Sequence, residues 1–299
     1  MTTRPVPSPP LEVVLRRGSV VEARHRVHAV VVQGGRVIAE AGDSALVTHF
    51  RSSAKPIQAL PLARARPDLA DDELAIACAS HLATAEQLDA VRRLLADAPA
   101  EDDELECGFG PTRLRHTCSG KHAGFLALCR ARGWASAGYR LADHPCQRLM
   151  LTEIAAAAEV EPRSVPTAID GCGVVTFALP LERMAHAFGR FPQLDGAARV
   201  GEAMRANPDL IQGPSSVDAM MMRGLPGWMA KVGAEGLLCA CSGDGVGVVL
   251  KVEDGGDWRA VRPALAEILR RVGDDLGADF GVVQLANSRG EPVAELAIA

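Results

Sequence analysis

Short apolar runs rich in β-branched residues lie near the start of the chain. Leu11–Leu15 and Val27–Gln33 are two of them, and Gly34-Gly35 joins the second run to the apolar segment Arg36–Ala39. Two glycines between runs of this kind are typical of a β-hairpin. The N-terminal part of the chain is therefore predicted to form antiparallel strands.

A second pair of apolar runs lies near the other end of the chain. Gly236–Ser242 and Val246–Val252 are separated by Gly243-Asp244-Gly245, which predicts another antiparallel hairpin, made of buried strands. With strands near both ends, we expect the two ends of the chain to meet in one sheet.

Helical patterns occupy the middle of the chain. Thr84 and Gln87 form a capping box ahead of an amphipathic helix that ends near Pro99. Further helical patterns cover Lys121–Arg132, Pro145–Val160 and Val261–Leu276. Strands at both ends with helices between them predict a mixed α+β fold, in which helices flank an antiparallel sheet. We expect residues 1–10, which are Pro-rich, to be a disordered tail and residues 11–299 to form a single catalytic domain.

Composition narrows the function. The chain has 299 residues, of which 48% are hydrophobic and 23% charged, as in ordinary soluble proteins. Its net charge of −5 argues against nucleic-acid binding. Without a run of about eighteen apolar residues or the apolar core of a signal peptide, we expect a cytoplasmic protein that does not enter membranes. In that compartment its eight cysteines are expected to be thiols or metal ligands.

The segment Arg51-Ser52-Ser53-Ala54-Lys55 places a serine three residues before a lysine. On a helix, residues three apart lie one turn apart on the same face, whereas Ser53 would face away from Lys55. A lysine amine can take the proton of a nearby serine if burial or a neighbouring cation lowers its pKa. Ser52 is thus a candidate nucleophile and Lys55 its base, although Ser-x-x-Lys alone often arises by chance.

Four more clusters contain reactive side chains, and each also has an ordinary structural interpretation. Ser80 ends an apolar run but can simply cap a helix, and Asp170 lies in a glycine-flanked turn of a common kind. Cys118 and Lys121 lie three residues apart at a helix start, and Lys231 precedes a strand, where a surface lysine is the default. Ser-x-x-Lys, a second serine and then Lys-x-Gly is the order of motifs in serine β-lactamases and penicillin-binding proteins.

Six motifs follow one another between about Glu12 and Asp254: Val20–His25, Arg51–Ala59, Cys78–His81, Cys118–Gly124, Asp170–Gly173 and Ala230–Gly236. Together they resemble the rhizobial-type L-asparaginases, the third structural class of asparaginases. The resemblance implies a serine β-lactamase-like fold, a homodimer, and release of L-aspartate and ammonia from L-asparagine through an acyl-serine.

The resemblance also implies roles for particular residues. It pairs Ser52 with Lys55 and Ser80 with Lys231, and it puts Arg51 and Asp170 near the substrate. It implies a zinc site with an unusual lysine ligand, made of Cys118, Lys121 and Cys172.

The chain departs from the family near the expected substrate. Leu82-Ala83 stands where the family usually has Ser-Gly, and Ser216 stands where an arginine usually precedes Asp218 by two residues. Two alternatives therefore stay open: an acyl-serine hydrolase of another small amide, such as glutamine, a peptide or a β-lactam, and a catalytically inactive zinc-thiolate relative.

Overall fold

The structure is a computed structural model and describes residues 8–108, 112–256 and 258–299. Residues 1–7, most of the predicted disordered tail, lie outside the described residues. In the remainder of that tail, Ser8 accepts a hydrogen bond from the Gly42 amide at 2.9 Å.

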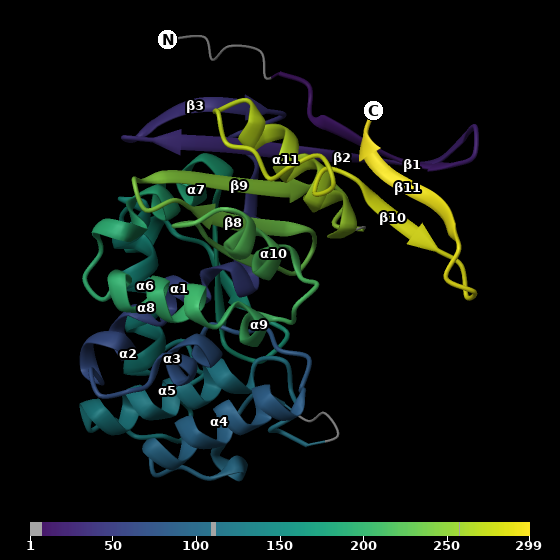
Figure 1. Cartoon of the computed structure of the whole chain (residues 1–299). Helices are drawn as coiled ribbons and strands as arrows, with labels where there is room; N and C mark the ends of the chain where they lie inside the picture. Colours follow the sequence, from purple (N-terminus) through teal and green to yellow (C-terminus); the bar gives the residue numbers. More distant parts are fainter. Residues whose placement is uncertain (1–7, 109–111, 257) are drawn as a thin grey trace, which may run out of the picture.

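An antiparallel sheet forms one layer of the molecule, at the top of the view in Figure 1. Its strands follow the order β10-β11-β1-β2-β9-β8-β7, and β3 also pairs with β2. The strands are β1 (Leu11–Arg17), β2 (Val20–Gln33), β3 (Arg36–Ala41), β7 (Met229–Gly233), β8 (Leu237–Cys241), β9 (Val246–Val252), β10 (Val283–Ala286) and β11 (Pro292–Ile298). Because β1 pairs with β11, the expectation that the two ends of the chain meet in one sheet is confirmed.

Both predicted hairpins are confirmed. Gln33 is paired with Arg36 across Gly34 and Gly35, whose φ angles of +56° and +77° suit glycine. The strands β8 and β9 pair from Leu237–Lys251 to Cys241–Gly247.

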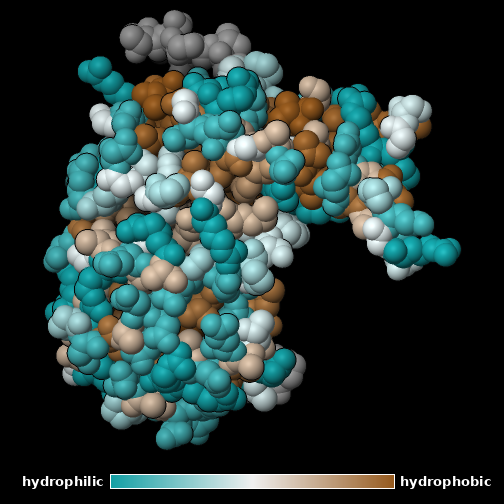
Figure 2. All heavy atoms as spheres, viewed as in Figure 1, coloured by the Kyte–Doolittle hydropathy of each residue, from teal (hydrophilic) through white to brown (hydrophobic). Residues whose placement is uncertain are grey.

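The centre of the sheet is buried on both faces. Along β2, Ala29 and Val31 point into an apolar cluster that includes residues of α11 (Val261–Arg270), while Val30 and Val32 point into a cluster that includes residues of α7 (Leu181–Arg190). This alternation explains why β2 is continuously apolar from Ala29 to Val32. On the face shown in Figure 2, apolar side chains are more frequent over the sheet than over the helical part.

The helical part lies below the sheet in Figure 1. It contains α1 (Lys55–Gln58), α2 (Leu60–Ala65), α3 (Asp71–Ala77), α4 (Ala85–Asp97), α5 (Ser119–Arg132), α6 (Pro145–Ala158), α8 (Ala197–Ala206), α9 (Pro208–Ile211) and α10 (Val217–Gly224). A small sheet of order β4-β6-β5 is made of β4 (Val47–His49), β6 (Val175–Pro180) and β5 (Thr167–Ile169). The predicted mixed α+β class is confirmed. None of the helices in the described ranges combines the length and apolar character needed to cross a bilayer.

Several local predictions in the helical part are also confirmed. The Thr84 hydroxyl accepts from the Gln87 amide, and the Gln87 side chain accepts from the Thr84 amide, so the capping box of α4 is present. Helix α5 ends at Gly133, which has a φ of +67°. These ends follow from the chemistry of single residues, which explains why the sequence predicts them.

Candidate active site

Ser52 and Ser80 line one cavity of about 360 Å³. Ser52 lies in the 3₁₀ helix η1 (Arg51–Ala54), and Ser80 follows α3. The turn between β7 and β8 closes another side of the cavity, and Trp258 lines it as well. A volume of this size is typical of small-molecule sites.

The two adjacent serines of η1 differ in environment. The Ser53 hydroxyl is buried and donates to the Lys231 carbonyl at 3.0 Å. Ser52 lies on the cavity, and within the described part of the chain its hydroxyl makes no hydrogen bond. The Ser52 oxygen is therefore the one of the two that a ligand in the cavity can meet.

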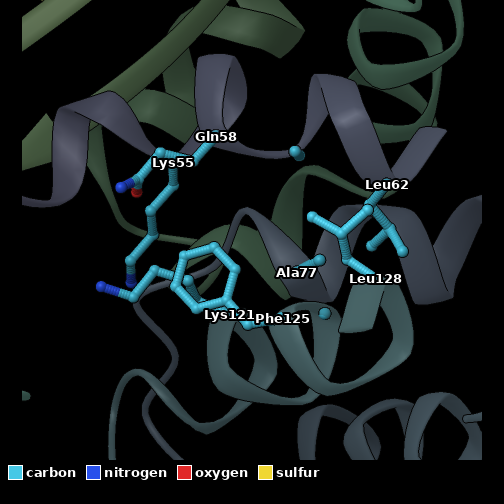
Figure 3. Close-up of a pocket in the computed structure, with 9 residues that line it drawn as sticks. Lys55, Gln58, Leu62, Ala77, Lys121, Phe125 and Leu128 are labelled. Carbon is cyan, nitrogen blue, oxygen red and sulfur yellow. The ribbon is translucent and has the colours of Figure 1, made fainter. Parts of the chain in front are cut away.

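Lys55 is buried, and its amine donates to the Ser80 hydroxyl at 3.0 Å and to the Ala79 carbonyl. Burial lowers the pKa of Lys55, and the Lys121 cation lowers it further, while Cys118 and Cys172 oppose these effects. Figure 3 shows the Lys55 and Lys121 side chains running to the same end of a small cavity that both line. A buried amine with a lowered pKa beside a hydroxyl can accept its proton.

The lysine contacts differ from the pairs that the resemblance implies. Lys55 is hydrogen-bonded to Ser80 and not to Ser52, because its long side chain extends from the start of α1 to the segment after α3. The Lys231 amine donates to the Val232 carbonyl at 2.8 Å and lies 3.6 Å from Asp218 Oδ2. Among the described contacts, Ser80 is thus joined to Lys55 and Lys231 to Asp218.

Lys231 and Asp218 form an ion pair without solvent-exposed side-chain area. Burial lowers the pKa of Lys231 to about 8, although the nearby Asp218 carboxylate raises it. Asp218 Oδ2 also accepts from the Val232 amide at 3.2 Å, whereas Oδ1 has no hydrogen-bond partner within the described residues. The sequence gives no role to Asp218, because an aspartate in the first turn of a helix is common on protein surfaces.

Cys118, Lys121 and Cys172 come together from the start of α5 and from the turn after β5. The Lys121 amine lies 3.1 Å from Cys172 Sγ, and the three side chains are buried. A hydrogen bond from Cys172 holds the pKa of Cys118 well below its ordinary range. Burial alone would lower the pKa of Lys121, but the Cys172 and Cys118 sulfurs raise it.

This cluster fits the donor atoms that zinc prefers, because two sulfurs and one nitrogen lie close together away from water. Across the described residues, no group of three or more His, Cys, Asp or Glu side chains is placed to hold a metal ion. A metal at this cluster would therefore need the Lys121 nitrogen, deprotonated, as a ligand.

Arg51 and Asp170, both expected near the substrate, contact each other. Arg51 Nε lies 2.6 Å from Asp170 Oδ1, and the Asp170 side chain is only 9% exposed. Arg51 has a φ of +49°, an unfavourable backbone conformation for a residue with a side chain. Its Nη1 lies 3.7 Å from Glu235 Oε1, in the turn between β7 and β8.

The residues that depart from the family have clear structural settings. Leu82 is 67% exposed, and Ala83 has a φ of +58°, which glycine would adopt more easily. The Ser216 hydroxyl caps α10 by accepting from the Ala219 amide at 3.3 Å. Ser216 thus fixes the helix that carries Asp218.

A serine hydroxyl beside a buried lysine amine, on a cavity of small-molecule size, is typical of serine hydrolases that cleave amides. Residues 13–298 match the model of a family described as L-asparaginase II. The chain belongs to this family, which implies a hydrolase that acts on amides of small molecules. The predicted family is confirmed. No curated protein matches the chain.

Solved structures with some similarity include a suggested β-lactamase from Bacteroides dorei DSM 17855, with 13% identity, a TM-score of 0.46, and coverage of 82% of this chain and 93% of that one. The native form of Mglu has 14% identity, a TM-score of 0.38, and coverage of 85% and 66%. A β-lactamase from Mycobacterium bovis has 16% identity, a TM-score of 0.33, and coverage of 82% and 92%.

Proposed function

We propose that the protein hydrolyses L-asparagine to L-aspartate and ammonia through an acyl-serine intermediate. Membership of the L-asparaginase II family supports hydrolysis of an amide. The observation that carries the mechanism is the cavity shared by Ser52 and Ser80, with the buried Lys55 amine hydrogen-bonded to Ser80.

In this mechanism Ser52 Oγ attacks the carbon of the substrate's side-chain amide. The Ser52 proton passes through the Ser80 hydroxyl to neutral Lys55, which burial favours by lowering the pKa of that amine. Lys55 returns a proton through Ser80 to the amide nitrogen, the carbon–nitrogen bond breaks, and ammonia leaves. Water then attacks the Ser52 ester, giving L-aspartate and free Ser52.

Lys231 acts on this proton transfer from a distance. It interacts electrostatically with Lys55, and two like charges in a buried site disfavour each other. A protonated Lys231 therefore favours the neutral form of Lys55. Asp218 holds Lys231 in place and favours its charged form.

Cys118, Lys121 and Cys172 are the residues that would hold zinc in this proposal. A bound zinc ion would supply a fixed positive charge near Asp170 and Arg51. The serine and lysine side chains carry the proton transfers, so we expect loss of the metal to raise the KM for L-asparagine more than it lowers kcat.

A coupled ammonia assay with L-asparagine tests substrate and nucleophile together. Ser52→Ala should abolish ammonia release, and Ser80→Ala should slow it by about 10²- to 10⁴-fold, the usual contribution of a proton-transfer group. Ser53→Ala is the matched control, since this neighbouring hydroxyl is bonded to the backbone away from the cavity. Full activity of Ser52→Ala would overturn the nucleophile, and an inactive wild type would overturn the substrate.

A second candidate function keeps the acyl-serine chemistry and changes the substrate. The exposed Leu82, in place of the family's usual serine, motivates it. Glutamine, blocked asparagine derivatives and chromogenic β-lactams should be poor substrates if the site is built for free asparagine, because such a site leaves polar groups unpaired with the wrong ligand. Preference for any of them would favour this second function. Robust ammonia release would exclude a catalytically inactive zinc-thiolate relative.

We also expect a homodimer and a cytoplasmic location. Light scattering of the purified protein, coupled to size-exclusion chromatography, tests the first. Microscopy of a tagged chain in its host cell tests the second.

A further inference from the structure

An amino-acid substrate carries an α-ammonium group, which a carboxylate at the site would bind. Asp170 is the carboxylate implied by the resemblance, but it is poorly placed for this role. Its Oδ1 binds Arg51 at 2.6 Å and accepts from the Gly171 amide at 2.8 Å. Asp170 is also not among the residues that line the cavity of Ser52 and Ser80.

Glu235 lines that cavity together with the two serines. It lies in the turn between β7 and β8, and its side chain is 64% exposed. Its carboxylate is therefore open to a ligand in the cavity, in contrast to that of Asp170.

The backbone of Glu235 has an unusual conformation. Its φ is +61°, a region in which glycine or asparagine is usual in tight turns. A glutamate at such a position costs conformational energy, and strained residues of this kind concentrate at binding sites. The following Gly236, with a φ of +65°, completes the turn that brings Glu235 onto the cavity.

Cations behind Glu235 hold the turn and orient its carboxylate. Arg51 Nη1 lies 3.7 Å from Glu235 Oε1, and Lys251 donates to the Glu235 carbonyl at 2.8 Å. Arg51 thus joins the two carboxylates: Asp170 accepts a hydrogen bond from its Nε, while its Nη1 lies near Glu235. Asp170 thereby acts as a positioning residue for Arg51.

We propose that Glu235 binds the α-ammonium group of the amino-acid substrate and so makes the site selective for free amino-acid amides. This inference rests on the proposed function, because it assigns the head-group contact of the same cavity. Because Glu235 and Ser52 line the same cavity from different elements, the ammonium group can be held in the turn while the side-chain amide reaches the serine.

Calorimetric titration with L-aspartate and with succinate tests the proposal, because these ligands differ only in the α-ammonium group. Glu235→Gln should weaken L-aspartate binding by roughly tenfold or more, the usual effect of losing a charged hydrogen bond, and leave succinate binding unchanged or tighter. Glu253→Gln, the same change at an exposed position paired with Arg26, is the matched control and should change neither. In the ammonia assay, Glu235→Gln should raise the KM for L-asparagine by a similar factor with little change in kcat.

Equal weakening of L-aspartate and succinate, or no weakening of either, would overturn the role of Glu235. Failure of the proposed function is distinguishable, since it appears as absent ammonia release by the wild type, whereas the titrations report binding without turnover. Selective loss of L-aspartate binding in Asp170→Asn, with none in Glu235→Gln, would assign the ammonium contact to Asp170 instead.

Discussion

Asp218→Asn perturbs the buried ion pair that holds Lys231 charged. The variant keeps the shape of the side chain and removes its charge, 3.6 Å from the Lys231 amine. At this separation and an effective dielectric constant of about 20, two unit charges attract each other by about 4 to 5 kcal/mol. Removing one partner of a buried pair costs about 3 to 5 kcal/mol in comparable proteins, so the two magnitudes agree.

The same change should move the pH at which Lys231 titrates. A pKa change of one unit corresponds to about 1.4 kcal/mol, so losing even a third of the attraction would lower the pKa of Lys231 from about 8 to about 7. If a protonated Lys231 favours the neutral form of Lys55, kcat/KM should fall on the alkaline side with this pKa. We expect the alkaline limb near pH 8 in the wild type and at least about one pH unit lower in Asp218→Asn.

The assay is the pH profile of kcat/KM for L-asparagine, combined with urea unfolding at pH 7. Asp89→Asn is the matched control, because this aspartate is exposed on α4 and forms a surface ion pair with Arg92. An alkaline limb that stays in place while the variant loses about 3 kcal/mol of stability would refute the electrostatic role of Lys231. Unchanged stability would refute the energetic importance of the ion pair itself.

Three further predictions concern stability and metal content. The pKa of Lys231 is about 8 in the folded protein and ordinarily 10.5, so between these pH values the unfolded chain binds this proton more tightly. The free energy of unfolding of the wild type, measured relative to that of Lys231→Met, should therefore rise by about 3 kcal/mol as the pH rises through this window. A constant difference between the two proteins in urea unfolding across this window would contradict the prediction. Ala83→Gly should stabilise the protein by about 0.5 to 1 kcal/mol by relieving the φ of +58°, and a lower melting temperature would show that the methyl group packs favourably. Cys172→Ser should lose the zinc measured by elemental analysis and raise the KM for L-asparagine, whereas Cys241→Ser, a buried thiol on β8, should keep the metal. Equal metal content in both variants would remove the zinc proposal.

The parts of the fold that the sequence predicts are those governed by neighbouring residues. The Gly34-Gly35 hairpin and the capping box of Thr84 and Gln87 both depend on residues within four positions of each other. Helix α7 is not among the predicted helices, although Leu181, Met184 and Phe188 follow helical spacing and are buried. Helix α7 contains none of the reactive motifs that draw attention to other segments. Its role in covering one face of the sheet becomes clear only from its packing in the structure.

The candidate residues of the site could be named from the sequence, but their contacts could not. Ser52, Ser80 and Lys55 follow from motifs, whereas the bond from Lys55 to Ser80 spans 25 positions and depends on the direction of a long side chain. Asp218 reaches Lys231 from a different element, so no local pattern indicates the pair. Glu235 lies in the motif Ala230–Gly236, and only its place on the cavity suggests what it binds.

Three buried lysines lie near one another at this site, and their partners give them different proton affinities. Lys121 is surrounded by sulfurs that raise its pKa, and Lys231 keeps a carboxylate partner although burial lowers its pKa to about 8. Lys55 contacts a hydroxyl, a carbonyl and the Cys118 sulfur, and burial lowers its pKa although that sulfur raises it. Groups whose surroundings separate their pKa values in this way are suited to different roles in acid–base catalysis. The hydrogen bond to Ser80 favours Lys55 as the base, and the Asp218 carboxylate favours Lys231 as the charge that disfavours protonation of Lys55.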